Sequence, residues 1–127
     1  MSLQWWSAPG KSCMPPDPRA YLWHARRAVA LVVEFVNHRS WADYEADPLL
    51  RSAVERQFEI VGEALSQLAR AAPDFAARVP DLPRIVAFRN LLIHGYAAID
   101  DRLVWEVASE RAAPLVAVLD DLLKAGS

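Results

Sequence analysis

The sequence contains a single cysteine, Cys13, among its 127 residues. A disulfide within the chain is therefore impossible, and a metal site built from several cysteines is excluded. Glycine is also scarce, with four residues, and none of them belongs to a glycine-rich loop of the kind that cradles phosphate groups. A functional site must be built from other side chains, and we expect neither a metal ion nor a bound cofactor.

An excess of charge and a long apolar run are both missing. The formal net charge is −2, which excludes the global positive field that drives non-specific binding to nucleic acids, so any contact with RNA must be local. The most apolar stretch, residues 28–36, is interrupted by Glu34 and is shorter than the roughly 18 residues of a membrane helix. The first residues do not resemble a secretory signal. We expect a cytoplasmic protein with no membrane contact.

The apolar content is high for a chain of this length. A length of 127 residues fits one domain, and 54% of the residues are hydrophobic, which is slightly above the usual share. Part of this apolar surface is therefore expected to be buried against a partner. Residues 1–18 contain Trp5, Trp6 and five proline or glycine residues, a composition that predicts an irregular N-terminal arm. The helical domain should then occupy residues 19–127.

Apolar residues recur at helical spacing in four regions. The first helix is expected from Arg19 to Val36, and the second, with the clearest stripe, from Leu49 to Ala71. Between them, residues 43–48 are predicted to form a polar connection. The second stripe contains Val54, Phe58, Val61, Leu65 and Leu68, whose spacing suits packing in a bundle.

The second half of the chain is divided by prolines. Between the second and third helices we expect at most a helical turn near residues 75–79. The third helix should begin near Pro83 and end near Gly95, because glycine accepts the left-handed conformation that often closes a helix. Asp100 is a natural N-cap for the last helix, which Pro114 should kink or divide. The pattern predicts an all-α, antiparallel up-and-down helical bundle of four main helices with short connectors.

Polar and titratable residues gather at the end of the third helix, in the segment 89–96. At 100° per residue, Arg89 and Tyr96 lie about 20° apart on a helix, but Arg89 and His94 lie about 140° apart. One straight helix cannot bring both groups to one atom. Either Gly95 ends the helix and redirects the side chains that follow, or a two-fold axis brings the same segment of a second subunit alongside.

Arginine and histidine are suited to the cleavage of RNA. The arginine fork binds phosphate, and histidine titrates near neutral pH. In a reaction without metal, Arg89 would stabilise the phosphoryl oxygens, and His94 would transfer the proton of the attacking 2′-hydroxyl. Asn90 would hold the histidine or a phosphate oxygen.

The pattern Arg-x4-His-x-Tyr, formed by Arg89, His94 and Tyr96, resembles the signature of HepT proteins in the larger HEPN group. The similarity covers roughly residues 20–123 in the right order. Three further stretches carry it: residues 53–64, 85–90 and 104–107.

The resemblance implies a homodimeric ribonuclease that is the toxin of a type VII toxin–antitoxin pair. Its partner would be a separate minimal nucleotidyltransferase of the MntA type. Arg89 and His94 would be the catalytic pair and Asn90 their polar neighbour. Tyr96 would be the residue to which the partner transfers AMP, which silences the enzyme. The family often has glutamate between His and Tyr, where this chain has Gly95.

Alternatives remain open at several of these positions. Glu63 either pairs with Arg89 and fixes its fork or is a solvated carboxylate, and Gly62 suggests close helix packing rather than catalysis. Alone, Arg89 and His94 also fit a surface ion pair and a histidine at a helix end. For the whole chain, the alternatives are a non-catalytic nucleotide-binding subunit of a nucleotidyltransferase complex and a purely structural helical dimer.

Overall fold

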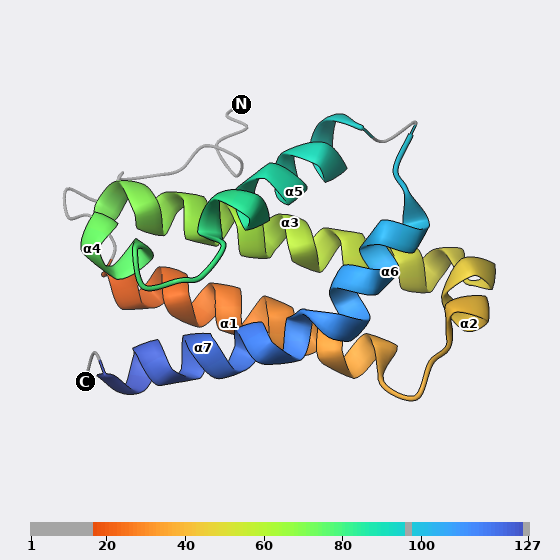
Figure 1. Cartoon of the computed structure of the whole chain (residues 1–127), viewed down its shortest axis with the longest axis horizontal. Coiled ribbons are helices and arrows are strands. Elements are labelled where there is room, and N and C mark those ends of the chain that lie inside the picture. Colours follow the sequence, from red (N-terminus) through yellow and green to blue (C-terminus); the bar gives the residue numbers. More distant parts are fainter. Residues whose placement is uncertain (1–16, 96–97, 126–127) are drawn as a thin grey trace, which may run out of the picture.

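The computed structural model describes residues 17–95 and 98–125 of the chain. These two segments form seven helices and contain no strands, which confirms the all-α class (Figure 1). The helices are α1 (Pro18–Val36), α2 (Trp41–Ala46), α3 (Pro48–Ala71), α4 (Pro73–Ala76), α5 (Leu82–His94), α6 (Asp101–Glu110) and α7 (Ala112–Ala125).

The four long helices α1, α3, α5 and α7 form the bundle. Helix α1 packs against α3 on one side and α7 on the other, and α5 lies on α3. Figure 1 shows that successive long helices run in opposite directions, as the up-and-down prediction requires. No helix within the described residues is both long enough and apolar enough to cross a membrane.

The predicted apolar faces of α1 and α3 lie in the core. Leu22, Val29 and Val32 of α1 are fully buried, as are Leu65 and Leu68 of α3. The remaining positions of the α3 stripe are also buried: Val54, Phe58 and Val61. The heptad-like spacing therefore located the central helix correctly.

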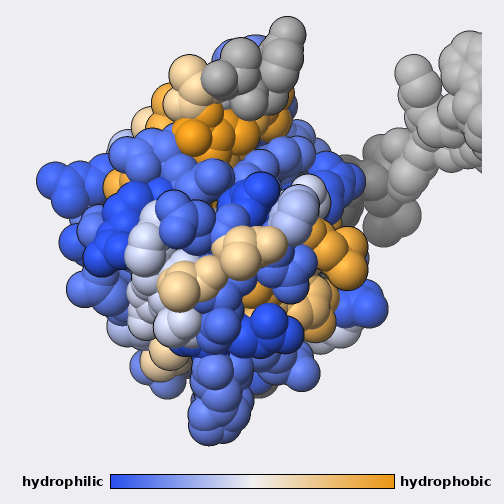
Figure 2. Space-filling view, turned by 90° about the vertical axis from the view of Figure 1, so that its right-hand side faces the viewer, coloured by the Kyte–Doolittle hydropathy of each residue, from blue (hydrophilic) through white to orange (hydrophobic). Residues whose placement is uncertain are grey.

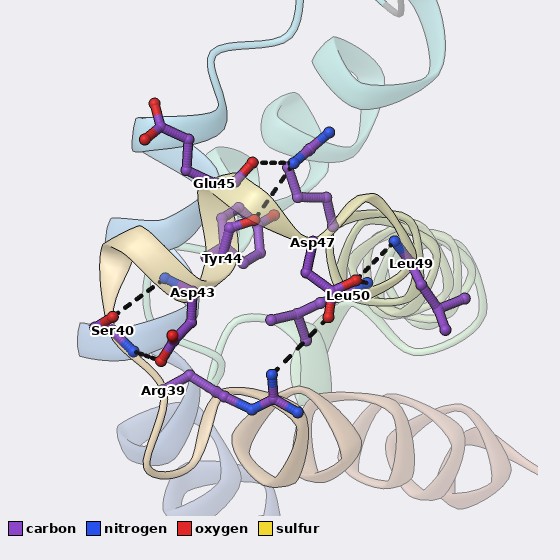
Figure 3. Close-up of polar contacts among 9 residues, drawn as sticks. Arg39, Ser40, Asp43, Tyr44, Glu45, Asp47, Leu49 and Leu50 are labelled. Carbon is purple, nitrogen blue, oxygen red and sulfur yellow. Dashed lines mark hydrogen bonds and ion pairs between the residues drawn. The ribbon is translucent and has the colours of Figure 1, made fainter.

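The predicted polar connection at residues 43–48 is wrong, because it contains most of α2. Ser40 and Asp43 form a reciprocal capping box at the start of this helix (Figure 3). The Asp43 backbone N–H donates to Ser40 Oγ over 3.1 Å, and the Ser40 N–H donates to Asp43 Oδ2 over 2.9 Å. These bonds favour the ionised carboxylate and lower the pKa of Asp43. The helix places the ring of Tyr44 completely inside the core.

Asp47 joins α2 to α3 directly. Its Oδ1 accepts hydrogen bonds from the backbone N–H groups of Leu49 and Leu50, each over 3.1 Å. The Nη1 atom of Arg39 lies 3.9 Å from the other carboxylate oxygen of Asp47, Oδ2 (Figure 3). Arg51 Nη1 donates a hydrogen bond to the backbone carbonyl of Glu45. This corner fixes where α3 begins, and therefore the register of its stripe.

The boundaries predicted for the third and last helices are confirmed, but the helical turn of the connector lies at residues 73–76 and not near 75–79. Helix α4 is the short turn of the connector, and Pro83 lies in the first turn of α5. Asp100 caps α6 by accepting from two backbone N–H groups. The last helix is divided at Arg111, three residues before Pro114. Residue 18 already belongs to α1, and residues 1–16 of the predicted arm, with Trp5 and Trp6, lie outside the described residues.

Candidate active site

The C-terminal end of α5 carries Arg89, Asn90 and His94, while Tyr96 lies outside the described residues. The helix ends at His94, as predicted, but the reason given for Gly95 is wrong. Its φ is −104°, which is not the left-handed conformation. A Cβ at this position would stand 2.7 Å from the Leu91 carbonyl oxygen. Glycine is therefore favoured here by lack of space beside the last turn.

The guanidinium of Arg89 is held by two charge-assisted hydrogen bonds. Nη2 donates to Glu63 Oε2 over 2.6 Å, and Nη1 donates to Asn90 Oδ1 over 2.7 Å. The predicted pairing of Glu63 with Arg89 is therefore confirmed, and the carboxylate is at the same time 43% exposed. The Arg89 side chain is 25% exposed, so it is partly shielded yet reachable from solvent. Its Nε is buried and has no partner among the described residues.

The stem of Arg89 lies directly against Gly62 of α3. A Cβ on Gly62 would stand 2.2 Å from Arg89 Cβ and 2.6 Å from Arg89 Cγ, distances at which something must move. The predicted close helix packing at Gly62 is confirmed, and the side chain that it admits is Arg89. The same glycine therefore positions the proposed site.

Gln67 extends the network by one further residue. Its Nε2 donates to Glu63 Oε1 over 3.2 Å, so Glu63 accepts from Gln67 through one oxygen and from Arg89 through the other. Glu63 thus bridges two polar side chains that are far apart in sequence. Gln67 was not predicted as a site residue, although its spacing of four residues from Glu63 puts both on one face of a helix.

A hollow of about 390 Å³ lies beside this network, between α1, α3 and α5. Its wall combines aromatic, charged, amide and aliphatic side chains. Besides Arg89, Glu63 and Gln67, it is lined by Tyr21, His24, Arg56, Glu59, Ile60, Ala64 and Ile93. We call it the Arg89 pocket.

His94 does not line the Arg89 pocket. Its side chain is exposed, and in the described part of the chain no hydrogen bond joins it to Arg89 or Asn90. Arg89 and His94 stand about 140° apart around α5. Within one chain, Arg89 contacts both Glu63 and Asn90, whereas His94 lies on the exposed side of α5, about 40° from Asn90.

A second and larger hollow, of about 680 Å³, flanks the other side of α5. It is mainly apolar and lies between α3, α5, α6 and α7, with Phe88, Leu103 and Leu115 in its wall. Leu91 and Ile93 of α5 and Leu103 of α6 are exposed. Figure 2 shows hydrophobic surface at the top of the molecule, where Figure 1 places the C-terminal end of α5.

The titratable groups whose pKa values are shifted lie around Tyr44, away from the Arg89 pocket. Burial raises the pKa of the Tyr44 hydroxyl, and the nearby carboxylates of Glu55 and Asp101 act in the same direction. Burial also raises the pKa of Glu55, followed by the effects of Asp101 and Glu59. Among the described residues, no group of three or more His, Cys, Asp or Glu side chains is placed to hold a metal ion.

Comparison with known proteins places the chain in a family. The family described as "Ribonuclease HepT-like" matches residues 25–122. "Putative RNase TTE0752" of Caldanaerobacter subterraneus subsp. tengcongensis is 31% identical over 107 residues, which are 84% of this chain and 95% of the relative. "Probable ribonuclease HepT" of Thermococcus cleftensis is 30% identical over 113 residues, which are 87% of this chain and 100% of the relative.

A third relative supports the same assignment. "Putative RNase MJ1380" of Methanocaldococcus jannaschii is 32% identical over 96 residues, covering 74% of this chain and 85% of the relative. No solved structure matches the chain. The family match covers most of α1 and all of α3 and α5, although it begins after Tyr21 and His24 of the pocket wall. The chain therefore belongs to the HepT-like ribonuclease family.

Proposed function

We propose that the protein is a metal-independent endoribonuclease in which Arg89 binds the scissile phosphate and His94 transfers protons. The observation that supports this most directly is the anchored guanidinium of Arg89, fixed by Glu63 and Asn90 beside an open pocket. A pre-oriented cation at a developing phosphoryl charge needs no reorganisation during the reaction. The names of the relatives, which describe ribonucleases, agree with this proposal.

The reaction begins with the 2′-hydroxyl of one nucleotide. His94 takes its proton, the oxygen attacks the adjacent phosphorus, and the bond from phosphorus to the 5′-oxygen of the next nucleotide breaks. A proton is returned to that leaving oxygen. Arg89 stabilises the negative charge that accumulates on the non-bridging oxygens during the attack.

The positions of Arg89 and His94 favour a homodimer as the active species. Ala87, Asn90, Leu91 and His94 are exposed on the side of α5 that faces away from α3, and we call them the outer face of α5. A two-fold contact on this face would bring the partner subunit's His94 towards Asn90, which accepts a hydrogen bond from the Arg89 guanidinium. The angle of about 140° between Arg89 and His94 on one helix then no longer prevents the two side chains from acting on one phosphate.

The proposal includes control by a separate nucleotidyltransferase of the MntA type, as the toxin half of a type VII toxin–antitoxin pair. AMP transfer to Tyr96 would add a bulky anion two residues after His94. Its phosphate would occupy the binding site of Arg89 and repel RNA. Tyr96→Phe should therefore remain active after incubation with the nucleotidyltransferase and ATP, whereas the wild type should be silenced.

The test of catalysis compares two histidine variants on labelled RNA in the presence of EDTA. His94→Asn should reduce the rate of cleavage by about 10²- to 10⁴-fold, the usual effect of losing one acid–base group. His38→Asn is the matched control, because asparagine tolerates the positive φ of 61° at this exposed position. Equal cleavage by both variants would reject His94 as the proton carrier. No cleavage by the wild type on any RNA would favour the nucleotide-binding subunit instead.

A further inference from the structure

The Arg89 pocket contains more than a phosphate-binding cation needs. A volume of about 390 Å³ falls within the usual range of small-molecule sites, about 300–1,000 Å³. Its wall combines the rings of Tyr21 and His24, the amide of Gln67 and the aliphatic side chains of Ile60 and Ile93. A phosphate group does not stack on aromatic rings or pack against aliphatic side chains, whereas a nucleobase does both.

We infer that this pocket takes one unstacked base of a single-stranded RNA, and that Gln67 determines which base is preferred. The inference rests on the proposed function, because the phosphate attached to that nucleotide is the one bound by Arg89. Proteins that recognise RNA sequence mostly target single-stranded bases, which they stack on aromatic or histidine rings and hydrogen-bond along their edges. The pocket offers both kinds of contact.

Gln67 is already oriented for such a contact. Its amide nitrogen donates to Glu63 Oε1, which determines which way the amide group points. Among the described residues, its Oε1 atom accepts no hydrogen bond, and the second amide hydrogen is also available. The side chain therefore presents one acceptor and one donor, the pair of groups that hydrogen-bonds to a base edge.

Glu63 connects the base to the phosphate. The carboxylate binds Gln67 through Oε1 and Arg89 through Oε2, so the two recognition groups are held by one side chain. A base that fits Gln67 would then be positioned relative to the guanidinium. This arrangement accounts for a glutamate that is 43% exposed and yet bound at both oxygens.

The surface next to the pocket is also suited to a single strand. The ring of His24 contacts that of Trp23, with centroids 5.3 Å apart, and Trp23 is 50% exposed. The guanidinium of Arg27 lies 5.6 Å from the Trp23 ring. Exposed aromatic rings beside arginine form the usual stacking platform for successive bases. Arg56, at the pocket wall, pairs with Glu59 at 3.4 Å but is 67% exposed, so it can still contact a phosphate of the backbone.

The test measures binding of RNA to the full chain carrying His94→Asn, which suppresses cleavage. The probes are fluorescein-labelled octamers of A, C and U, and the readout is the dissociation constant from fluorescence anisotropy. We expect the three constants to differ. Gln67→Met should weaken the tightest complex by about 3- to 10-fold and reduce the difference between octamers, because a hydrogen bond to the base is lost. Gln57→Met, on the same helix but outside the pocket, is the matched control and should change nothing.

The stacking contacts are tested separately. His24→Ala and Trp23→Ala should each weaken all three complexes by about 5-fold or more, the effect of losing one stacked base. Two results would overturn the inference: equal affinities for the three octamers, or an equal loss for all three in Gln67→Met. The second result would mean that Gln67 acts only through Glu63 and Arg89.

Cleavage assays with the native His94 distinguish this inference from the proposed function. Cleavage that depends on Arg89 and His94, with a base preference unchanged by Gln67→Met, would reject the base pocket and leave the ribonuclease in place. Base-dependent binding that Gln67→Met abolishes, without any cleavage, would reject the ribonuclease and leave the base pocket in place.

Discussion

The Arg89 side chain crosses α3 at Gly62, where even a single methyl group would have to share space with Arg89 Cβ at 2.2 Å. Arg89 Cβ is fixed to the α5 backbone, so rotation of the arginine cannot relieve the overlap. The spacing between α3 and α5 is therefore set at this crossing. The guanidinium reaches Glu63, the neighbour of Gly62, because the two helices approach so closely.

Gly62→Ala should destabilise the protein and reduce cleavage of RNA. Alanine gains about 1 kcal/mol over glycine from helix propensity. Overpacking of a core typically costs about 1–3 kcal/mol, and here it should outweigh that gain because α5 must move. Urea unfolding gives the stability, and cleavage assays give the activity. A more stable variant with full activity would show that α5 shifts without consequence.

Glu63→Gln should reduce activity more than stability. The ion pair is partly exposed, so we expect its loss to cost about 1 kcal/mol or less. Arg89 would lose its charged anchor at 2.6 Å, and in the proposed mechanism the rate of cleavage depends on the position of the guanidinium. Glu59→Gln is the matched control, since Glu59 lines the same pocket and pairs with Arg56 at 3.4 Å instead. Equal activity of the two variants would contradict the positioning role.

Glu55→Gln should change how stability depends on pH. Burial, Asp101 and Glu59 raise the pKa of Glu55 in the folded protein. The folded state therefore keeps a proton that the unfolded chain has already released. The protonated Glu55 side chain contributes to the free energy of unfolding. This contribution is complete below the ordinary glutamate pKa and is lost as the pH rises through the raised pKa of the folded protein.

Removal of the ionisable group at residue 55 should therefore make the protein more stable near neutral pH, relative to the wild type. The decline in stability between about pH 4 and 7 should also become smaller. Urea unfolding across this range measures both effects. Glu45→Gln, at an exposed position of α2, should leave the pH profile unchanged. A steeper decline in Glu55→Gln would contradict the argument.

Leu91→Glu should convert the proposed dimer into monomers. Leu91 is 45% exposed on the outer face of α5, and a carboxylate on each subunit would place two like charges in the proposed contact. Leu49 is 80% exposed at the start of α3, so Leu49→Glu is the control with the same change elsewhere. Light scattering at micromolar concentration gives the mass. A wild-type chain that is already monomeric would remove the composite site.

The sequence predicted the long helices because their apolar residues repeat over many turns. It missed α2, since six residues are too few to show a period, and the polar residues around Tyr44 concealed its burial. The local signal was nevertheless present in the capping pair Ser40 and Asp43. A short helix of this kind is indicated by its cap and not by its pattern.

The contacts around Arg89 could be predicted where a single pair of residues decides them, while the roles of the site residues stay predictions. Glu63 and Arg89 were matched as opposite charges, and Gly62 was expected at a close approach. That Gln67 and the exposed His24 line one pocket could not be predicted, because this depends on the register of α1 and α3 against each other. No periodicity within a single helix contains that information.

The position of α5 has a consequence for how the protein opens. This helix packs mainly on α3 and has a hollow on each flank, whereas α1 is covered by both α3 and α7. Few buried contacts mean a low free energy of local opening. Amide hydrogens of α5 should therefore exchange with solvent faster than those of α1 and α3. RNA bound at Arg89 should slow this exchange by linking α5 to α1 and α3, which line the same pocket.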